Sequence, residues 1–173
     1  NHRTEGMSLF VIDMKSPGIT LQLLNIQVET AERQYMVFFD NVRLPADALI
    51  GEAGKGARLM FEGLNAERLL AASAALGLGE YVLKKSVAYS LDRKPFGKPI
   101  GSYQAVQHPM ALAKAELEAA RLMTYSAAER FDAGEDAGAH ANMAKLLASR
   151  AAKAAIEAAI QTHGGYAFDR DYD

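Results

Sequence analysis

Ala57-Arg-Leu-Met-Phe-Glu-Gly-Leu-Asn-Ala-Glu-Arg-Leu-Leu-Ala-Ala-Ser-Ala-Ala-Leu76 opens a long run of Ala, Leu, Glu, Lys and Arg at helical spacing, and this run indicates a helical architecture for most of the chain. From here onward, this composition predicts three long helices, near residues 57–91, 103–132 and 138–162. The breaks between them contain Gly, Pro and Asp, residue types that end helices.

Alanine dominates the last two of these helices, and nineteen alanines lie between residues 111 and 160. Small side chains let helix axes approach closely. We therefore expect the helices to pack against each other and against further helices, in this chain or in a partner subunit. The pattern does not support a sustained heptad coiled coil.

Residues 1–52, which precede the helices, are rich in β-branched and aromatic residues. Three apolar runs of strand length lie at residues 7–13, 19–24 and 34–44. We expect at least three antiparallel strands from them. Ser16-Pro17-Gly18 should form the turn between the first two, and the third should end before Pro45, which cannot donate to a sheet ladder.

The expected fold class is therefore α+β, an antiparallel β segment followed by an up-down helical bundle. We expect residues 1–52 to be the C-terminal part of a β-domain and residues 53–173 to be an incomplete helical bundle domain. A strand segment of about 50 residues has a marginal core by itself, so its strands should pair with sheet that this chain lacks. The sequence starts at Asn1 without Met, and we expect it to be a piece of a longer protein.

The composition excludes several classes of function. Lys and Arg number 19 against 21 Asp and Glu, so the formal net charge is -2 and no nucleic acid or anionic lipid partner is expected. No apolar stretch is long enough to span a membrane. The absence of Cys excludes disulfides, thiolate nucleophiles and Cys-bound zinc. A carboxylate-bridged di-iron centre needs Glu-x-x-His pairs, and none occurs, so no metal is expected.

Glu67 is the first candidate for chemistry. At helical spacing its neighbours are apolar or small, and no basic residue lies three or four positions away. If this stripe faces a cavity, desolvation makes the carboxylate a stronger general base. The competing interpretation is a partly exposed glutamate at a helix edge, or one paired with a distant Lys or Arg.

Two loops contain candidate ligands for a cofactor. The loop at residues 93–102 combines Arg93 and two lysines with the ring of Phe96 and with glycines that permit close backbone approach. This combination suits a phosphate-bearing aromatic ligand, but the residues alone favour an interhelical turn whose Phe plugs the core and whose basic residues are solvated. Gln104 is open to both interpretations. Gln161-Thr-His-Gly-Gly165 is typical of a glycine helix cap, and its bare backbone also suits a ligand.

Taken in order, five phrases of the sequence resemble the acyl-CoA dehydrogenase family of flavoproteins. They are Glu5-Gly-Met-Ser-Leu-Phe-Val-Ile-Asp13, Phe39-Asp-Asn-Val-Arg-Leu-Pro45 through Glu52, Leu64-Asn-Ala-Glu-Arg68, Arg93-Lys-Pro-Phe-Gly-Lys-Pro-Ile-Gly-Ser-Tyr-Gln-Ala-Val-Gln107 and Gln161-Thr-His-Gly-Gly-Tyr166. The resemblance covers almost the whole chain. It implies the second half of a middle β-domain, followed by three helices of a C-terminal four-helix bundle.

The resemblance also implies FAD as the cofactor, bound between the subunits of a homodimer or homotetramer. Six residues would contact it: Arg93, Phe96, Gln104, Gln161, Gly164 and Gly165. The first two would approach the adenosine and pyrophosphate part of a neighbouring subunit's FAD. The family commonly has glycine at the position of Ala167, so a less close contact is expected there.

In that family a glutamate removes the α-proton of an acyl-CoA thioester while the β-hydrogen leaves as hydride to the flavin, giving the trans-2-enoyl-CoA. Most members carry this glutamate at a position beyond Asp173. A subset carries it on the first bundle helix, immediately before an arginine. Glu67-Arg68 matches the second placement, so the resemblance implies that Glu67 is the base. Asn65 and Arg68 match positions that contact the CoA portion or its surroundings.

The expected activity is therefore acyl-CoA dehydrogenation, as in fatty acid β-oxidation, with electrons passed to an electron-transfer flavoprotein. An acyl-CoA oxidase that uses oxygen is one alternative, and a non-catalytic helical oligomerisation module is another. The chain by itself is expected to be inactive, because it lacks half of the flavin pocket. The expected location is the bacterial cytoplasm or the mitochondrial matrix.

Overall fold

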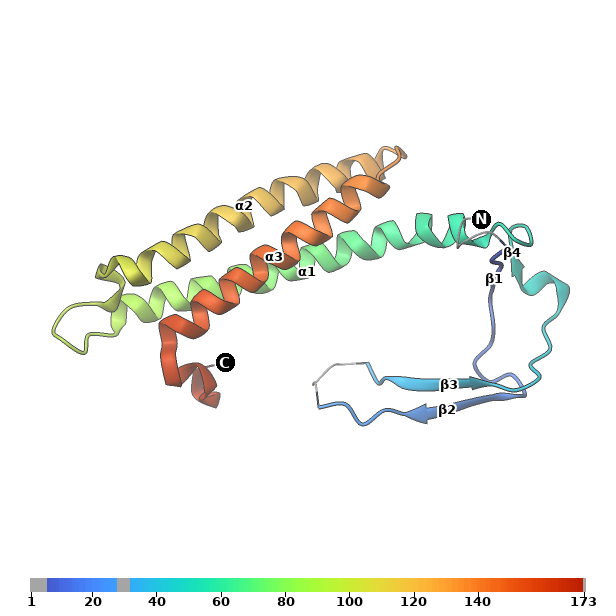
Figure 1. The fold of residues 1–173 in the computed structure, drawn as a ribbon, viewed down its shortest axis with the longest axis horizontal. Coiled ribbons are helices and arrows are strands. Elements are labelled where there is room, and N and C mark those ends of the chain that lie inside the picture. The colour runs from blue at the N-terminus through green and yellow to red at the C-terminus, as the bar shows by residue number, and fades with distance from the viewer. Residues whose placement is uncertain (1–5, 28–31, 173) are drawn as a thin grey trace. The chain divides into compact units, whose positions relative to one another are not determined.

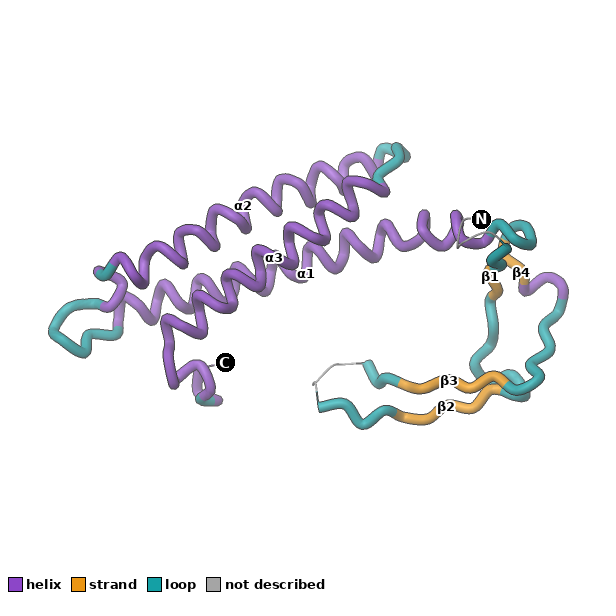
Figure 2. The backbone as a smooth tube through the Cα atoms, in the orientation of Figure 1, coloured by secondary structure: helices purple, strands orange, loops and turns teal. Residues whose placement is uncertain are grey.

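The computed structural model describes residues 6–27 and 32–172, which excludes Glu5 of the first family-like phrase. The chain divides into two compact units, Asn1–Met60 and Phe61–Asp173. Figure 1 labels the helices and strands, and Figure 2 shows that the strands precede all the long helices along the chain.

The first unit contains two small antiparallel sheets. β1 (Leu9–Phe10) pairs with β4 (Leu49–Ile50), and β2 (Ile19–Leu23) pairs with β3 (Tyr35–Phe39). The predicted antiparallel pairing is therefore confirmed. β4 was not predicted, because two residues are too few to show an alternating pattern.

The predicted turn before β2 is also confirmed. Gly18 has a φ of 89°, and a Cβ there would lie only 2.2 Å from the Asp40 carbonyl oxygen, so the turn needs glycine. The third strand ends at Phe39 and not at residue 44 as predicted. Asn41 has a φ of 49°, a left-handed conformation that Asn tolerates better than most residues and that breaks the extended run before Pro45.

None of the described residues from 6 to 27 and from 32 to 55 is buried. The β2–β3 hairpin exposes large apolar side chains, among them Leu23 at 54% and Phe39 at 58%. A two-stranded hairpin with uncovered apolar residues is marginal by itself. That these strands pair with sheet outside this chain stays a prediction.

Three long helices follow, and they confirm the predicted helices to within one residue at each end. They are α1 (Gly56–Asp92), α2 (Gln104–Asp132) and α3 (Gly138–His163). Short 3-10 turns lie at Ile100–Ser102 before α2, and at Gly164–Phe168 and Arg170–Tyr172 after α3. The second unit is thus a three-helix bundle with its connections.

The core of this bundle is lined mostly by alanine. Buried residues recur at alternating spacings of three and four, as at Leu69, Ala72 and Leu76 in α1, Ala113, Leu117 and Ala120 in α2, and Ala141, Ala144 and Ala148 in α3. This is the spacing of helices that cross at a small angle. The heptad spacing that the sequence did not reveal is therefore present. Alanine occupies exposed positions as well as buried ones, so composition hides the buried stripe.

All three helices meet at Gly79. A Cβ on this residue would lie 2.7 Å from Leu117 Cδ2 of α2 and 3.1 Å from Ala152 Cα of α3. Leu117 is fully buried. The missing side chain therefore lets α1 approach both partners at this level of the bundle.

Candidate active site

Glu67 lies on an exposed face of α1. Within residues 6–27 and 32–172, its carboxylate has no hydrogen bond or ion pair. The apolar neighbours Leu64 and Leu70 are also uncovered, with 37% and 66% of their surface exposed. The stripe predicted around Glu67 is thus an open apolar surface that surrounds one unpartnered carboxylate.

Asn65 and Arg68 lie together on another side of the same helix, and both are half-buried. Arg68 Nη1 donates to Asn65 Oδ1 at 2.9 Å and to the Phe61 carbonyl at 3.3 Å. The Arg68 guanidinium carbon also lies 6.0 Å from the centre of the Phe61 ring. No carboxylate pairs with Arg68 among the described residues, so its positive charge is held in place but is not neutralised.

The loop after α1 exposes the aromatic residue that the sequence analysis singled out. Phe96 is 84% exposed, so the interpretation that it plugs the core is wrong. The backbone on either side is ordered by hydrogen bonds of the Arg93 N–H to the Tyr89 carbonyl and of the Ile100 N–H to the Arg93 carbonyl, both 2.9 Å long. Gln104 is exposed where α2 begins.

Two glycines of this loop differ in their surroundings. A Cβ on Gly101 would lie 2.8 Å from Ser90 Oγ, so this glycine is needed where the loop contacts α1. Gly97 has a φ of 82° and faces open space. The close backbone approach predicted for this loop therefore occurs at Gly101, where the loop packs against α1. The backbone at Gly97 faces open space, where a ligand could lie.

The predicted glycine cap of α3 is confirmed. Gly164 has a φ of 61°, and its N–H bonds to the Ile160 carbonyl. A Cβ on Gly164 or Gly165 would meet nothing within 4 Å. Gln161 and both glycines are exposed, so this segment presents bare backbone and an amide side chain together.

The structure brings the Arg93 loop and the double-glycine segment side by side. The Arg93 guanidinium carbon lies 5.7 Å from the centre of the Tyr166 ring. One turn earlier, Tyr89 stacks on His163 with ring centres 4.3 Å apart. Tyr89 has no predicted role, because a single tyrosine in a helix carries no sequence signal of a partner 74 positions away. The two predicted FAD-binding segments thus share one end of the bundle.

The predicted base does not lie at this end. Glu67 lies within α1, and Arg93 directly follows the last residue of that helix and still bonds to the Tyr89 carbonyl. The two residues are 26 positions apart, which corresponds to about 39 Å at the rise of an α-helix. Helix α1 is continuous between them. The described part of the chain therefore carries two separate groups of candidate residues, one around residues 61–68 and one around the Arg93 loop.

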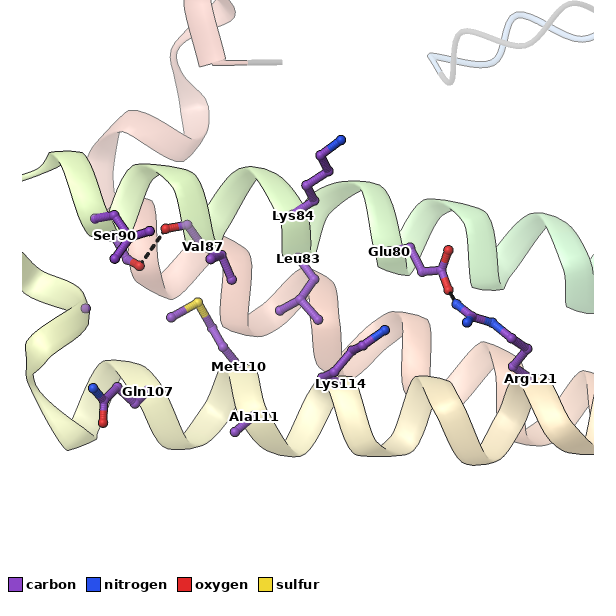
Figure 3. A pocket seen from close by; sticks show the side chains of 12 residues that line it. Glu80, Leu83, Lys84, Val87, Ser90, Gln107, Met110, Ala111, Lys114 and Arg121 are labelled. Atoms are coloured by element: carbon purple, nitrogen blue, oxygen red, sulfur yellow. Dashed lines mark hydrogen bonds and ion pairs between the residues drawn. The ribbon is translucent and has the colours of Figure 1, made fainter.

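A groove of about 670 Å³ runs between α1 and α2. Figure 3 shows Leu83 and Met110 between the two helices, with Glu80 and Arg121 forming an ion pair across them. None of the predicted base, CoA or FAD residues lines this groove. It is a mostly apolar surface of the bundle that borders the Arg93 loop at Gly101 and does not include residues 61–68.

No three His, Asp or Glu side chains gather to hold a metal ion in the part of the chain that the structure describes. Over the same residues, no helix combines the length and apolarity that crossing a membrane requires.

Comparison with known proteins agrees with this architecture. Residues 54–173 match the domain family described as acyl-CoA dehydrogenase, C-terminal domain. Acyl-CoA dehydrogenase FadE12 of Mycobacterium tuberculosis is 41% identical over 167 residues, which cover 95% of this chain and 43% of that protein. CarC of Acetobacterium woodii, a subunit of a caffeyl-CoA reductase-Etf complex, is 32% identical over 174 residues, or 98% of this chain and 45% of CarC.

A solved structure of PigA with FAD and proline superposes with a TM-score of 0.91 at 30% identity, over 98% of this chain and 45% of PigA. The chain thus spans less than half of the length of the relatives that it matches. The domain match, the identity to FadE12 and the helical bundle agree, and the chain belongs to the acyl-CoA dehydrogenase family.

Proposed function

We propose that the complete protein is an FAD-dependent acyl-CoA dehydrogenase that converts an acyl-CoA thioester into the trans-2-enoyl-CoA. The observation that carries this proposal is the unpartnered carboxylate of Glu67 on an exposed apolar face of α1. The name of the FadE12 relative supports the substrate class. Residues 1–52 would complete a β-domain, and residues 53–173 would form most of the helical bundle domain.

Glu67 would act as the base that takes the α-proton. An acyl chain lying along Leu64 and Leu70 would cover the apolar stripe and displace water from it. The carboxylate has no hydrogen-bond donor within the described residues, so its oxygens would stay available to the substrate. General-base catalysis of this kind contributes about 10²- to 10⁴-fold to the rate.

Arg68 and Asn65 would bind the CoA portion. The guanidinium is oriented by Asn65 and by the Phe61 carbonyl and has no carboxylate partner among the described residues, so it can pair with a phosphate. Because Arg68 follows Glu67 directly, the base and the CoA contact would be positioned by one turn of the same helix.

The residues around the Arg93 loop fit the nucleotide part of FAD. Arg93 is exposed, Phe96 offers an exposed ring, and Gly164 and Gly165 leave open space at their backbone. Gln104 and Gln161 would add amide contacts from the ends of α2 and α3. The PigA structure with FAD supports this choice of cofactor. When bound, the flavin supplies the acceptor for the hydride from the substrate's β-carbon.

The separation of the two groups supports a homodimer or homotetramer. The distance of about 39 Å between Glu67 and Arg93 along α1 exceeds the length of one dinucleotide. The FAD held by Arg93 would therefore serve the Glu67 of another subunit. The bundle also exposes apolar residues that a second copy could cover, among them Leu112 and Leu122 of α2, at 66% and 73%.

An electron-transfer flavoprotein is the proposed electron acceptor, as the name of the CarC complex suggests for a relative. Transfer to oxygen is the competing outcome, and steady production of hydrogen peroxide during turnover would reveal it. The bacterial cytoplasm or the mitochondrial matrix, where acyl-CoA esters are oxidised, is the proposed location.

The test compares the complete protein with its Glu67→Gln variant. Acyl-CoA esters of several chain lengths are added without oxygen, and the flavin absorbance is followed. We expect the wild type to bleach and the variant to keep its flavin but bleach at least about 100-fold more slowly. Glu129→Gln, which removes another exposed helix carboxylate, should bleach like the wild type.

Equal bleaching of the wild type and Glu67→Gln would place the base elsewhere. If the wild type holds FAD and none of the added acyl-CoA esters bleaches its flavin, the dehydrogenase proposal itself is contradicted.

A further inference from the structure

Four aromatic rings lie at the end of the bundle that carries the Arg93 loop and the double glycine, and they form one cluster, defined here as the clamp: Tyr89, His163, Tyr166 and Tyr172. Tyr89 stacks on His163 at 4.3 Å with an angle of 25° between the rings. Tyr172 meets Tyr89 edge-on at 5.8 Å and lies 5.2 Å from Tyr166. These centroid distances lie in, or just below, the range in which aromatic pairs attract each other.

The clamp joins the two segments at two successive levels. Tyr89 contacts His163, and one helical turn later Arg93 lies against Tyr166. A hydrogen bond from the Arg93 N–H to the Tyr89 carbonyl ties the two levels together on the α1 side. On the other side, only Gly164 and Gly165 separate His163 from Tyr166. The two glycines are therefore bracketed by the two contacts.

The clamp is distinct from the bundle core. Its rings are half-buried or exposed, and none belongs to the buried core cluster. His163 Nδ1 lies 2.9 Å from the Ala159 carbonyl, so the imidazole can donate there and hold its ring in the stacking orientation. Because glycine backbone is unusually free, the double glycine needs such outside contacts to keep one position relative to Arg93.

We propose that the clamp is a positioning device for FAD: it fixes the double glycine against the Arg93 loop, so that both segments present one preformed surface to the nucleotide. This inference rests on the proposed FAD site and assigns the clamp residues a role in cofactor affinity. Without the clamp, the two segments sample other positions, and the apparent affinity falls with the fraction of molecules in the binding geometry.

The test measures FAD affinity directly, on the complete protein freed of its flavin, by titration with FAD and detection of flavin fluorescence. Tyr89→Leu removes the stack and should raise the FAD dissociation constant about 2- to 12-fold, the range that the loss of one aromatic pair allows. Tyr89→Phe keeps the ring and should bind like the wild type. Tyr81→Leu removes another tyrosine of α1, one that contacts Lys85 outside the clamp, and should also bind like the wild type.

Circular dichroism and thermal unfolding of each flavin-free variant accompany the titration. If Tyr89→Leu does not fold, Tyr172→Leu tests the same clamp from its exposed end, with the same expected rise. A folded Tyr89→Leu or Tyr172→Leu with wild-type FAD affinity would overturn the clamp proposal, even if its thermal stability falls. A wild type that binds no FAD would instead overturn the proposed cofactor site.

Discussion

Two glycines of α1 lie two residues apart and should respond oppositely to the same substitution. A Cβ on Gly79 would lie 2.7 Å from Leu117 Cδ2 and 3.1 Å from Ala152 Cα, whereas a Cβ on Gly77 meets nothing within 4 Å. Both are helical, so alanine removes the same backbone freedom from the unfolded chain at each position. We predict that Gly77→Ala stabilises the bundle and that Gly79→Ala does not.

The magnitudes follow from these contacts. Replacing glycine by alanine inside a helix gains about 1 kcal/mol, which is the whole effect at Gly77. At Gly79 the new methyl group needs roughly 1 Å more room, because carbon atoms pack at about 3.5–4 Å. Leu117 has 0% exposure and the second neighbour is backbone, so neither can move away easily. Overpacking costs about 1–3 kcal/mol, so Gly79→Ala should lie about 1–3 kcal/mol below Gly77→Ala.

Urea unfolding of the 173-residue chain, followed by circular dichroism, measures this difference from the two midpoints and a common m-value. If Gly79→Ala is as stabilising as Gly77→Ala, the helices are not in close contact at this level and the described packing is wrong. Lowered stability of Gly77→Ala would equally refute the reasoning.

Two further predictions concern the proposed cofactor site. Gly164→Ala should lower the free energy of unfolding by about 1–3 kcal/mol in thermal or urea unfolding, because Gly164 has a φ of 61° and a ψ of -133°, a combination that residues other than glycine adopt only under strain. Gly165→Ala should raise the free energy of unfolding by about 0.4–1 kcal/mol, because its φ is not positive and a Cβ there meets nothing within 4 Å, and it should weaken FAD binding in a fluorescence titration. Unchanged FAD affinity of Gly165→Ala would argue against a cofactor at the double glycine. Arg93→Ala should raise the FAD dissociation constant about 10- to 100-fold through the loss of a charge-assisted hydrogen bond, while Lys94→Ala, its exposed neighbour, should change it less than about 3-fold; equal effects of the two would indicate only general electrostatic attraction.

The helices could be predicted from sequence because their signals are local. Helix formers continue for many turns, and Gly, Pro and Asp mark each break, so the bounds of α1, α2 and α3 agree with prediction within one residue. The third strand was predicted too long, because the apolar residues continue past Phe39 while Asn41 turns the backbone. Apolar pattern alone does not report a positive φ.

The sequence predicts individual candidate residues for the site, but it does not predict the contacts between them. Spacing identified the apolar stripe at Glu67, and composition identified the Arg93 loop and the double glycine. The alternatives left open at Phe96 were resolved only by its exposure. The clamp joins Tyr89 to residues that lie 74 or more positions later in the chain, such as His163. A single sequence carries no signal of such a pair.

The buried stripe of small residues and the long span of α1 together explain how one helix can contribute to two sites. Ala72 and Gly79 let α1 pack closely on one side against its partner helices. Its other side exposes Glu67, while Tyr89 lies in its last turn and Arg93 follows directly after its last residue, Asp92. Because a rigid helix keeps these two groups about 39 Å apart, they cannot converge on one cofactor by bending. Under the proposed function, each complete site therefore takes its base from one subunit and its nucleotide contacts from another, so assembly would be a condition for catalysis.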